Sequence, residues 1–294
     1  MVEAREMLKE RSENLFVIPF DDRPGKLFDG LQHCRSSIFI SQVSSEERLN
    51  LRTSRYQRWF TEFRDSLFAE IEYADLISEL IHPDQYPKYA NSAEEAVFGK
   101  LKQFSSQDVN NLRIRKDTQN YIFYQEATQY WIKATFGLPY YSKNGVVDAP
   151  AHGRYIYFSD EETALGICAV LNSNLFYAYF IAYGDCFHLS DKLATGFPVS
   201  SDFIRNEQLL KLSRMLMSDL KRNASRKTIN TKDGDSISYD EFSARKSKHI
   251  IDQIDRFLAQ YYGFTDEELD FIINYDIKYR MGLDSLEVTE DAAV

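Results

Sequence analysis

The chain has 294 residues, of which 44% are hydrophobic, so it can bury a substantial core as one large domain or two modest ones. No run approaches the roughly 20 apolar residues of a membrane helix, and the charged N-terminus lacks a signal-peptide segment, which predicts a soluble, cytoplasmic protein with no membrane partner. Its three cysteines fit neither a paired zinc pattern nor a disulfide framework, and the net charge of -10 excludes nucleic-acid binding unless positive charge is concentrated locally.

The N-terminal part predicts a helix followed by two strands. Residues 4–11 carry apolar side chains at helical spacing, 15–20 form a compact apolar run, and 36–41 form another one after the turn at 21–25. Two strands are too few for a domain, so this pair needs further strands from the chain or from a partner. We expect residues 15–41 to be the least self-sufficient part of the structure.

The next part predicts a linker between two helices. Arginines interleave with large aromatic rings over residues 48–63, and helices are expected at 70–81 and 92–104. Between these helices, Pro83 and Pro87 indicate a domain boundary.

The middle of the chain predicts a small mixed or antiparallel sheet over residues 112–158, where short Tyr- and Ile-rich runs are broken by Gly and Pro. A capping box beginning at Ser159 starts a helix that runs to about Leu175. A second buried segment is expected at 176–183.

The C-terminal part predicts amphipathic helices at 206–221 and 250–261, joined through a polar turn at 230–236 without packing content. A capping box at Thr265 starts the last helix. Its dense polar residues are expected to fix this helix to the rest of the fold: Tyr275, Asp276, Lys278, Tyr279 and Arg280.

Catalytic motifs are missing from the sequence. It has no GxGxxG, GxxxxGK[ST], HExxH or GxSxG pattern, and its five histidines are scattered. The nearest carboxylate and lysine grouping for a metal-dependent nuclease falls on a polar loop that enters a helix: Asp240, Glu241, Lys246 and Lys248. We interpret this grouping as a solvated helix entrance, so no catalytic or metal-binding residue is predicted. We interpret Asp185 and His188 as a polar pair that fixes a turn, and a contact with DNA is the less favoured alternative.

Three separated stretches share a pattern with one family. They are FDDRPGKLFDGLQHCRSSIFI with SRYQRWFTEFRDSLF (20–40 and 54–68), LNSNLFYAYFIAYGDCFHLSDKLATGFPV (171–199) and IDQIDRFLAQYYGFTDEELDFIINYDIKYRMG (251–282). Together they resemble the region downstream of the catalytic core in large adenine-specific DNA methyltransferases, including type IIG restriction-modification enzymes. The last stretch is the most specific, and the resemblance covers most of the chain in order.

The resemblance implies an α+β fold in four parts. Residues 1–82 hold the closing strands and a helix of a methyltransferase domain, and 83–204 form a small mixed β target-recognition domain. Residues 205–282 form a helical region, and 283–294 form a disordered acidic tail. The N-terminal strand pair is then left over from a methyltransferase sheet.

The family's catalytic features are absent. Such enzymes bind S-adenosylmethionine through a Gly-containing loop and present Asn-Pro-Pro-Tyr to the target adenine, whereas this sequence has neither motif and no Pro-Pro at all. The resemblance therefore implies that this chain holds no cofactor, and that S-adenosylmethionine binds a missing catalytic half. That half is either a separate polypeptide or a lost part of a longer gene.

Candidate DNA contacts are basic or amide side chains that can reach phosphates or base edges of double-stranded DNA. They are Arg52, Arg55, Arg58, Arg113, Arg115, Lys116, Lys133, Lys143, Asn144, Lys221, Arg222, Arg226 and Lys227. Residues 205–248 hold 11 basic and 6 acidic residues, a local excess suited to tracking a DNA backbone. A charged, solvated helix pair explains the same excess, and any single arginine is also explained as a solubilising charge.

Three hypotheses follow. The chain is a DNA-recognition module that works with a catalytic methyltransferase half, a non-catalytic interaction or vestigial protein without DNA affinity, or an intact enzyme with an unrecognised site.

Overall fold

The computed structural model describes residues 2–30, 34–43, 49–81, 86–104, 106–128 and 130–282. The fold is α+β, and the chain divides into two compact units: Met1–Lys102 with Ile181–Tyr183, and Gln103–Phe180 with Gly184–Val294. The predicted boundary near residue 83 falls inside the first unit, and the helical region from 205 shares the second unit with the preceding sheet. The predicted acidic tail and part of the predicted linker lie outside the described residues.

The first unit is built on a four-stranded sheet with strand order β2-β1-β3-β4. Strand β1 pairs with β2 in antiparallel fashion and with β3 in parallel, and β3 pairs with β4 in antiparallel fashion. The bounds of its elements are α1 (Val2–Arg11), β1 (Ser12–Phe20), β2 (Ser36–Val43), β3 (Asn50–Thr53), η1 (Thr61–Ser66), β4 (Ala74–Asp75), η2 (Ser78–Leu80) and α2 (Ser92–Gln103). The two predicted strands are confirmed, and the further strands that they need come from this chain.

Strand β1 is buried on both faces because its side chains alternate between two apolar clusters. Leu15 and Val17 pack in one cluster, whereas Ile18 and Phe20 pack in the other with Trp59. Strand β2 lies at the end of the sheet, and most of its side chains are exposed. No described strand pairs with its outer edge.

The predicted helix at 70–81 is wrong. The segment contains strand β4, in which Ala74 and Asp75 pair with Thr53 and Arg52 of β3, and the short 3-10 turn η2. Pairing with an existing sheet edge here overrides a weak local helical preference. The predicted helices at 4–11 and 92–104 are confirmed as α1 and α2.

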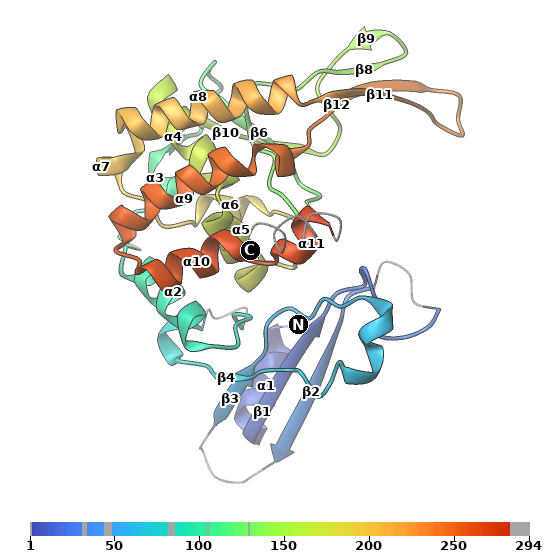
Figure 1. Cartoon of the computed structure of the whole chain (residues 1–294), viewed down its shortest axis with the longest axis vertical. Coiled ribbons are helices and arrows are strands. Elements are labelled where there is room, and N and C mark those ends of the chain that lie inside the picture. Colours follow the sequence, from blue (N-terminus) through green and yellow to red (C-terminus); the bar gives the residue numbers. More distant parts are fainter. Residues whose placement is uncertain are drawn as a thin grey trace, which may run out of the picture. The chain divides into compact units, whose positions relative to one another are not determined.

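The second unit combines two four-stranded sheets with a set of helices (Figure 1). One sheet has strand order β5-β10-β6-β7, and all of its pairings are antiparallel. The small mixed or antiparallel sheet predicted over 112–158 is therefore confirmed in part, because β8 and β9 of this segment belong to the other sheet. Its strands are β5 (Arg113–Ile114), β6 (Tyr121–Gln125), β7 (Thr135–Phe136) and β10 (Gly153–Phe158). The helical elements are α3 (Val109–Leu112), α4 (Glu161–Asn172), α5 (Asn174–Tyr183), α6 (Asp191–Thr195), α7 (Ser201–Ile204), α8 (Glu207–Arg222), η3 (Ala244–Ser247), α9 (Lys248–Tyr262), α10 (Asp266–Asn274) and α11 (Ile277–Met281). The last three residues of α5, Ile181–Tyr183, belong to the first unit.

Helices α4 and α5 form the centre of the core, and their side chains are almost all buried. The predicted single helix from Ser159 to Leu175 is corrected in two places. Asp160 is the N-cap of α4, and the helix ends at Ser173, whose side chain accepts the backbone N–H of Phe176 and caps α5. The amphipathic helices α8 and α9 and the Thr265 capping box are confirmed.

The predicted last helix from Thr265 is two helices in the structure, because α10 ends at Asn274 and α11 begins at Ile277 after Asp276, which has a left-handed backbone. Helix α11 is fixed by one buried arginine, as expected from the polar density of this segment. Arg280 is 3% exposed, and its guanidinium lies 3.8 Å from the ring centre of Trp131 and 4.2 Å from that of Tyr177. It donates hydrogen bonds to the Tyr130 carbonyl at 2.9 Å and to Asn174 Oδ1 at 2.7 Å. Planar stacking and directed hydrogen bonds together satisfy a charge that burial would otherwise make costly.

Among the described residues, no single helix is long and apolar enough to cross a membrane. Helices α4 and α5 reach the necessary length and composition only as a pair, with a 66° bend between them.

Candidate nucleic-acid interface

A second sheet of the second unit projects from its helices, and we call it the arm (Figure 1). It consists of β8 (Tyr141–Lys143), β9 (Val146–Val147), β11 (Ser225–Asn230) and β12 (Ser236–Glu241), in the order β11-β12-β8-β9. All of its pairings are antiparallel. Six of the predicted DNA contacts lie on the arm or at its base, although about 80 residues of chain separate the two hairpins: Lys143, Asn144, Lys221, Arg222, Arg226 and Lys227.

The turns of the arm follow from local sequence. Asn144 and Gly145 connect β8 to β9 with positive φ angles of 53° and 80°, a conformation that Asn-Gly adopts readily in two-residue hairpin turns. Asp233 and Gly234 lie in the turn between β11 and β12, where Gly234 has a φ of 88°. Each hairpin therefore closes at residues that tolerate left-handed backbone.

The two hairpins are held together near these turns. Lys143 Nζ lies 2.5 Å from Asp235 Oδ2, and Asn144 Nδ2 donates to Asp235 Oδ1 at 2.8 Å. The hydrogen bond from Lys143, followed by that from Asn144, lowers the pKa of Asp235. In return, Asn144 Oδ1 accepts the backbone N–H of Ser236 at 2.8 Å. This contact fixes the register of two hairpins that are distant in sequence.

A preorganised arginine stands at the base of the arm. Arg226 Nε donates to Asp240 Oδ1 at 2.7 Å, and the guanidinium carbon lies 3.4 Å above the ring centre of Tyr140. No described residue accepts a hydrogen bond from its two Nη groups. Because stacking and one ion pair already hold the planar group, these Nη donors are available for an anion.

The other basic residues of the arm are exposed. Lys227 Nζ lies 3.6 Å from Glu241 Oε2, and Arg222 pairs with the buried Asp219, which also accepts from Ser247 at 2.7 Å. Lys221 is exposed on the last turn of α8 and makes no ion pair with any described residue.

Four further predicted contacts lie elsewhere in the second unit. Arg113 pairs with Asp191 at 2.8 Å, whereas Arg115 and Lys116 are exposed. Lys133 lines a depression of about 330 Å³ beside Phe242 and Arg245. Desolvation lowers the pKa of this lysine, with Glu241 acting in the opposite direction, although the side chain as a whole is exposed.

The three arginines of the first unit do not form an exposed basic cluster. Arg52 Nε pairs with Asp75 at 2.6 Å, and Arg55 pairs with the buried Glu94. Arg58 is 8% exposed and bonded to Asp21 at 2.7 Å. Its role is to neutralise a buried carboxylate, so we do not carry Arg58 into the proposed interface.

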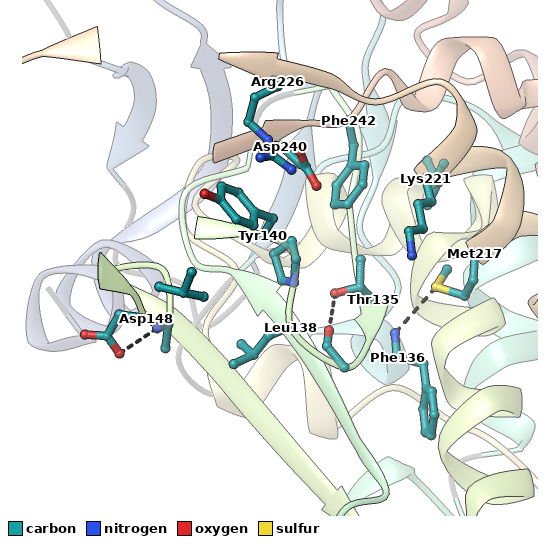
Figure 2. Close-up of a pocket in the computed structure, with 15 residues that line it drawn as sticks. Thr135, Phe136, Leu138, Tyr140, Asp148, Met217, Lys221, Arg226, Asp240 and Phe242 are labelled. Atoms are coloured by element: carbon teal, nitrogen blue, oxygen red, sulfur yellow. Dashed lines mark hydrogen bonds and ion pairs between the residues drawn. The ribbon is translucent and has the colours of Figure 1, made fainter. Parts of the chain in front are cut away.

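A cavity of about 850 Å³ opens at the base of the arm (Figure 2). Helix α8 contributes Met217, Leu220 and Lys221, and the arm contributes Arg226 and Asp240. Tyr140 and Phe242 supply aromatic rings, and the segment between β7 and Tyr140 supplies an apolar wall.

Sequence reasoning missed Tyr140, Asp240 and Phe242 as members of this site because it missed two strands. The predicted polar turn at 230–236 is confirmed at 231–235, but the strands β11 and β12 that flank it were not predicted. The available signal was Asp233-Gly234 between two runs with β-branched residues, which is typical of a hairpin. Both runs are polar and lie on a largely exposed sheet, so the alternation of apolar residues that marks a buried strand is absent.

The carboxylates that were considered for a nuclease do not gather. Asp240 and Glu241 are on β12, whereas Lys246 is in η3 and Lys248 begins α9 and binds Asp252 at 2.7 Å. In the described parts of the chain, no group of three or more His, Cys, Asp or Glu is arranged to hold a metal ion. Asp185 and His188 form the expected pair, with Nδ1 at 3.0 Å from Oδ2.

No family model matches the chain, and a search of curated proteins returns no match.

Proposed function

We propose that this chain binds double-stranded DNA through the arm, as the recognition part of an adenine-specific DNA methyltransferase. Methyl transfer would then belong to a separate catalytic half that binds S-adenosylmethionine. The methyltransferase assignment is supported by the three resembling stretches of sequence, and the DNA-binding surface is supported by the geometry of the arm.

The observation that carries the proposal is the convergence of two distant basic segments on one projecting antiparallel sheet of four strands. The major groove of DNA admits a two-stranded ribbon, and the hairpin of β11 and β12 at the edge of this sheet has that form, so its side chains can reach base edges. The arm presents Lys143 and Asn144 beside the start of β12, and Arg226 and Lys227 on the fully exposed β11. Thr228 and Ser238, whose hydroxyls are 2.8 Å apart, add hydrogen-bonding groups on the face of the hairpin that carries Arg226.

The ion pairs of the arm do not prevent DNA binding. The side chains of Lys143, Arg226 and Lys227 remain 50–52% exposed within their pairs. Exposed pairs of this kind contribute little to stability because water screens both charges, so a phosphate can replace the carboxylate at small cost. Lys221 and Lys232, which are exposed and make no ion pair with a described residue, are available without any exchange.

The test is the affinity of the full chain for a fluorescent duplex, measured by anisotropy at low salt. We expect a variant with Lys143→Ala, Lys227→Ala and Lys232→Ala to bind roughly tenfold more weakly or worse, because three phosphate contacts are removed. The matched control replaces three exposed lysines that were not predicted as contacts, Lys26→Ala, Lys102→Ala and Lys211→Ala. Equal losses in both variants would reject the arm as the interface, and no binding by the unmodified chain would favour the interaction or vestigial alternative.

A further inference from the structure

The cavity at the base of the arm has the dimensions of a small-molecule site. Its volume of about 850 Å³ lies within the roughly 300–1,000 Å³ that is usual for ligand pockets. It belongs wholly to the second unit, so its shape is set by one packed body.

Charged groups line the cavity on two sides. Figure 2 shows Met217 and Lys221 on α8, with Arg226, Asp240 and Tyr140 grouped across from them. Apolar and aromatic surface comes from Phe136, Leu138, Pro139, Met217, Leu220 and Phe242. A ligand that fits this arrangement has a flat apolar ring and an anionic group.

Two cations that line the cavity, Arg226 and Lys221, are available to bind an anion. Arg226 is held by its stack on Tyr140 and its bond to Asp240, and its Nη donors have no described acceptor. Lys221 lines the same cavity and makes no ion pair with a described residue. A phosphate that reaches both side chains replaces no existing contact of Lys221.

The carboxylate in the cavity wall favours bases that carry an exocyclic amine. Asp240 Oδ1 accepts from Arg226, which leaves Oδ2 as an acceptor within the cavity wall. An exocyclic amine, such as those of adenine, cytosine and guanine, donates to a carboxylate, whereas thymine carries no such amine. Aromatic side chains and guanidinium planes are the surfaces on which unpaired bases stack.

We propose that this cavity binds a single unpaired nucleotide, with its phosphate at Lys221 and Arg226, its ring against the aromatic and apolar wall, and a base amine at Asp240. The nucleotide comes either from solution or from DNA held by the arm. Only the second source rests on the proposed function.

Two binding measurements on the full chain separate these sources. Calorimetry with dAMP, dTMP and deoxyadenosine tests the free nucleotide, and we expect dAMP to bind about tenfold more tightly than either of the others. Anisotropy compares a paired duplex with the same duplex carrying one additional unpaired adenosine, and we expect tighter binding of the second.

Two variants test the location. Lys221→Ala removes an exposed cation and should weaken dAMP about tenfold, whereas Lys211→Ala, ten residues earlier on α8, should leave it unchanged. Ala149→Trp places a large ring in the cavity from a partly exposed position and should abolish dAMP binding without removing any charge.

The outcomes are distinct. Binding of dAMP without a preference for the unpaired duplex supports the free nucleotide, and a preference that Ala149→Trp removes supports the DNA-borne one. If no duplex binds but dAMP does, the DNA-binding proposal fails and the nucleotide site stands. If Lys221→Ala and Ala149→Trp change neither the affinity for dAMP nor the affinity for the duplex with the unpaired adenosine, the cavity is not a nucleotide site.

Discussion

Two buried charges, Asp255 and Arg280, organise the C-terminal helices of the second unit through a shared asparagine. Asp255 is 1% exposed and accepts the backbone N–H groups of Asn174 at 3.1 Å and Leu175 at 3.0 Å, which places a carboxyl group at the first turn of α5. Asn174 Nδ2 donates to Asp255 at 2.7 Å, while Asn174 Oδ1 accepts from Arg280. The amide thus links an acid and a base that each would be costly to bury alone.

The titration of Asp255 makes a pH-dependent contribution to stability. Burial raises its pKa to about 6, against the hydrogen bonds from Leu175 and Asn174. An unfolded Asp has a pKa near 3.9, so the folded state holds the proton more tightly. This contribution is fully present below about pH 4 and is lost as the pH rises through about 6, a change of about 2–3 kcal/mol.

Urea unfolding of the protein and of Asp255→Asn, measured from pH 4 to pH 7, tests this contribution. We expect the free energy of unfolding of the unmodified protein to fall relative to the variant across that range. The control is Asp270→Asn, which removes the same charge from an exposed position of α10. The difference in the free energy of unfolding between the unmodified protein and this control should not change over the same pH range. A difference between protein and Asp255→Asn that does not vary with pH would contradict the raised pKa.

At the scale of elements, the arm depends on turn residues more than on packing. All six side chains of β11 are exposed, and the sheet is held by ladder hydrogen bonds and cross-strand pairs. The conformation of Gly234, at a φ of 88°, is therefore a large part of what specifies the hairpin.

Gly234→Ala tests this dependence. No atom lies within 4 Å of the added Cβ, so the expected loss of about 1 kcal/mol comes from left-handed backbone alone. Hydrogen exchange of the β11 and β12 amides should quicken while the amides of α4 and α5 remain unchanged. The same substitution at Gly99 in α2, where the space is also open and φ is not positive, should stabilise the protein by a similar amount.

At the scale of the whole molecule, a net charge of -10 opposes DNA everywhere except where basic side chains gather. Binding through the arm should therefore depend steeply on salt. If about four phosphates are contacted, the affinity should fall about 10²-fold between roughly 50 and 200 mM salt. An affinity that does not change with salt would argue against phosphate contacts by the arm.

Methyl transfer provides a second test at this scale. Because the glycine loop and the Asn-Pro-Pro-Tyr motif are missing from the sequence, we expect the pure chain to transfer no labelled methyl group from S-adenosylmethionine to DNA. Transfer above the level of a protein-free control would support the third hypothesis, an enzyme with an unrecognised site.

Much of the helical structure and strand β1 could be predicted from the sequence because their signals are local. The leucines of α8, the Thr265 capping box and the apolar run of β1 each act within a few residues. Short strands were harder, because β4 and β12 exist only through their partners β3 and β11. A two-residue strand such as Ala74–Asp75 carries no periodicity to detect.

The sequence by itself determined the α+β class, the strand pair at the N-terminus, the amphipathic helices and the basic residues that are candidates for DNA contact. The tertiary structure decided which of those residues lie together. It buried Arg58 and Arg280 in different units, and it joined Lys143 and Asn144 to Arg226 and Lys227 on one arm. The physical reason is that pairing between β8 and β12 spans about 90 residues, and no local propensity encodes the partner of an exposed polar strand.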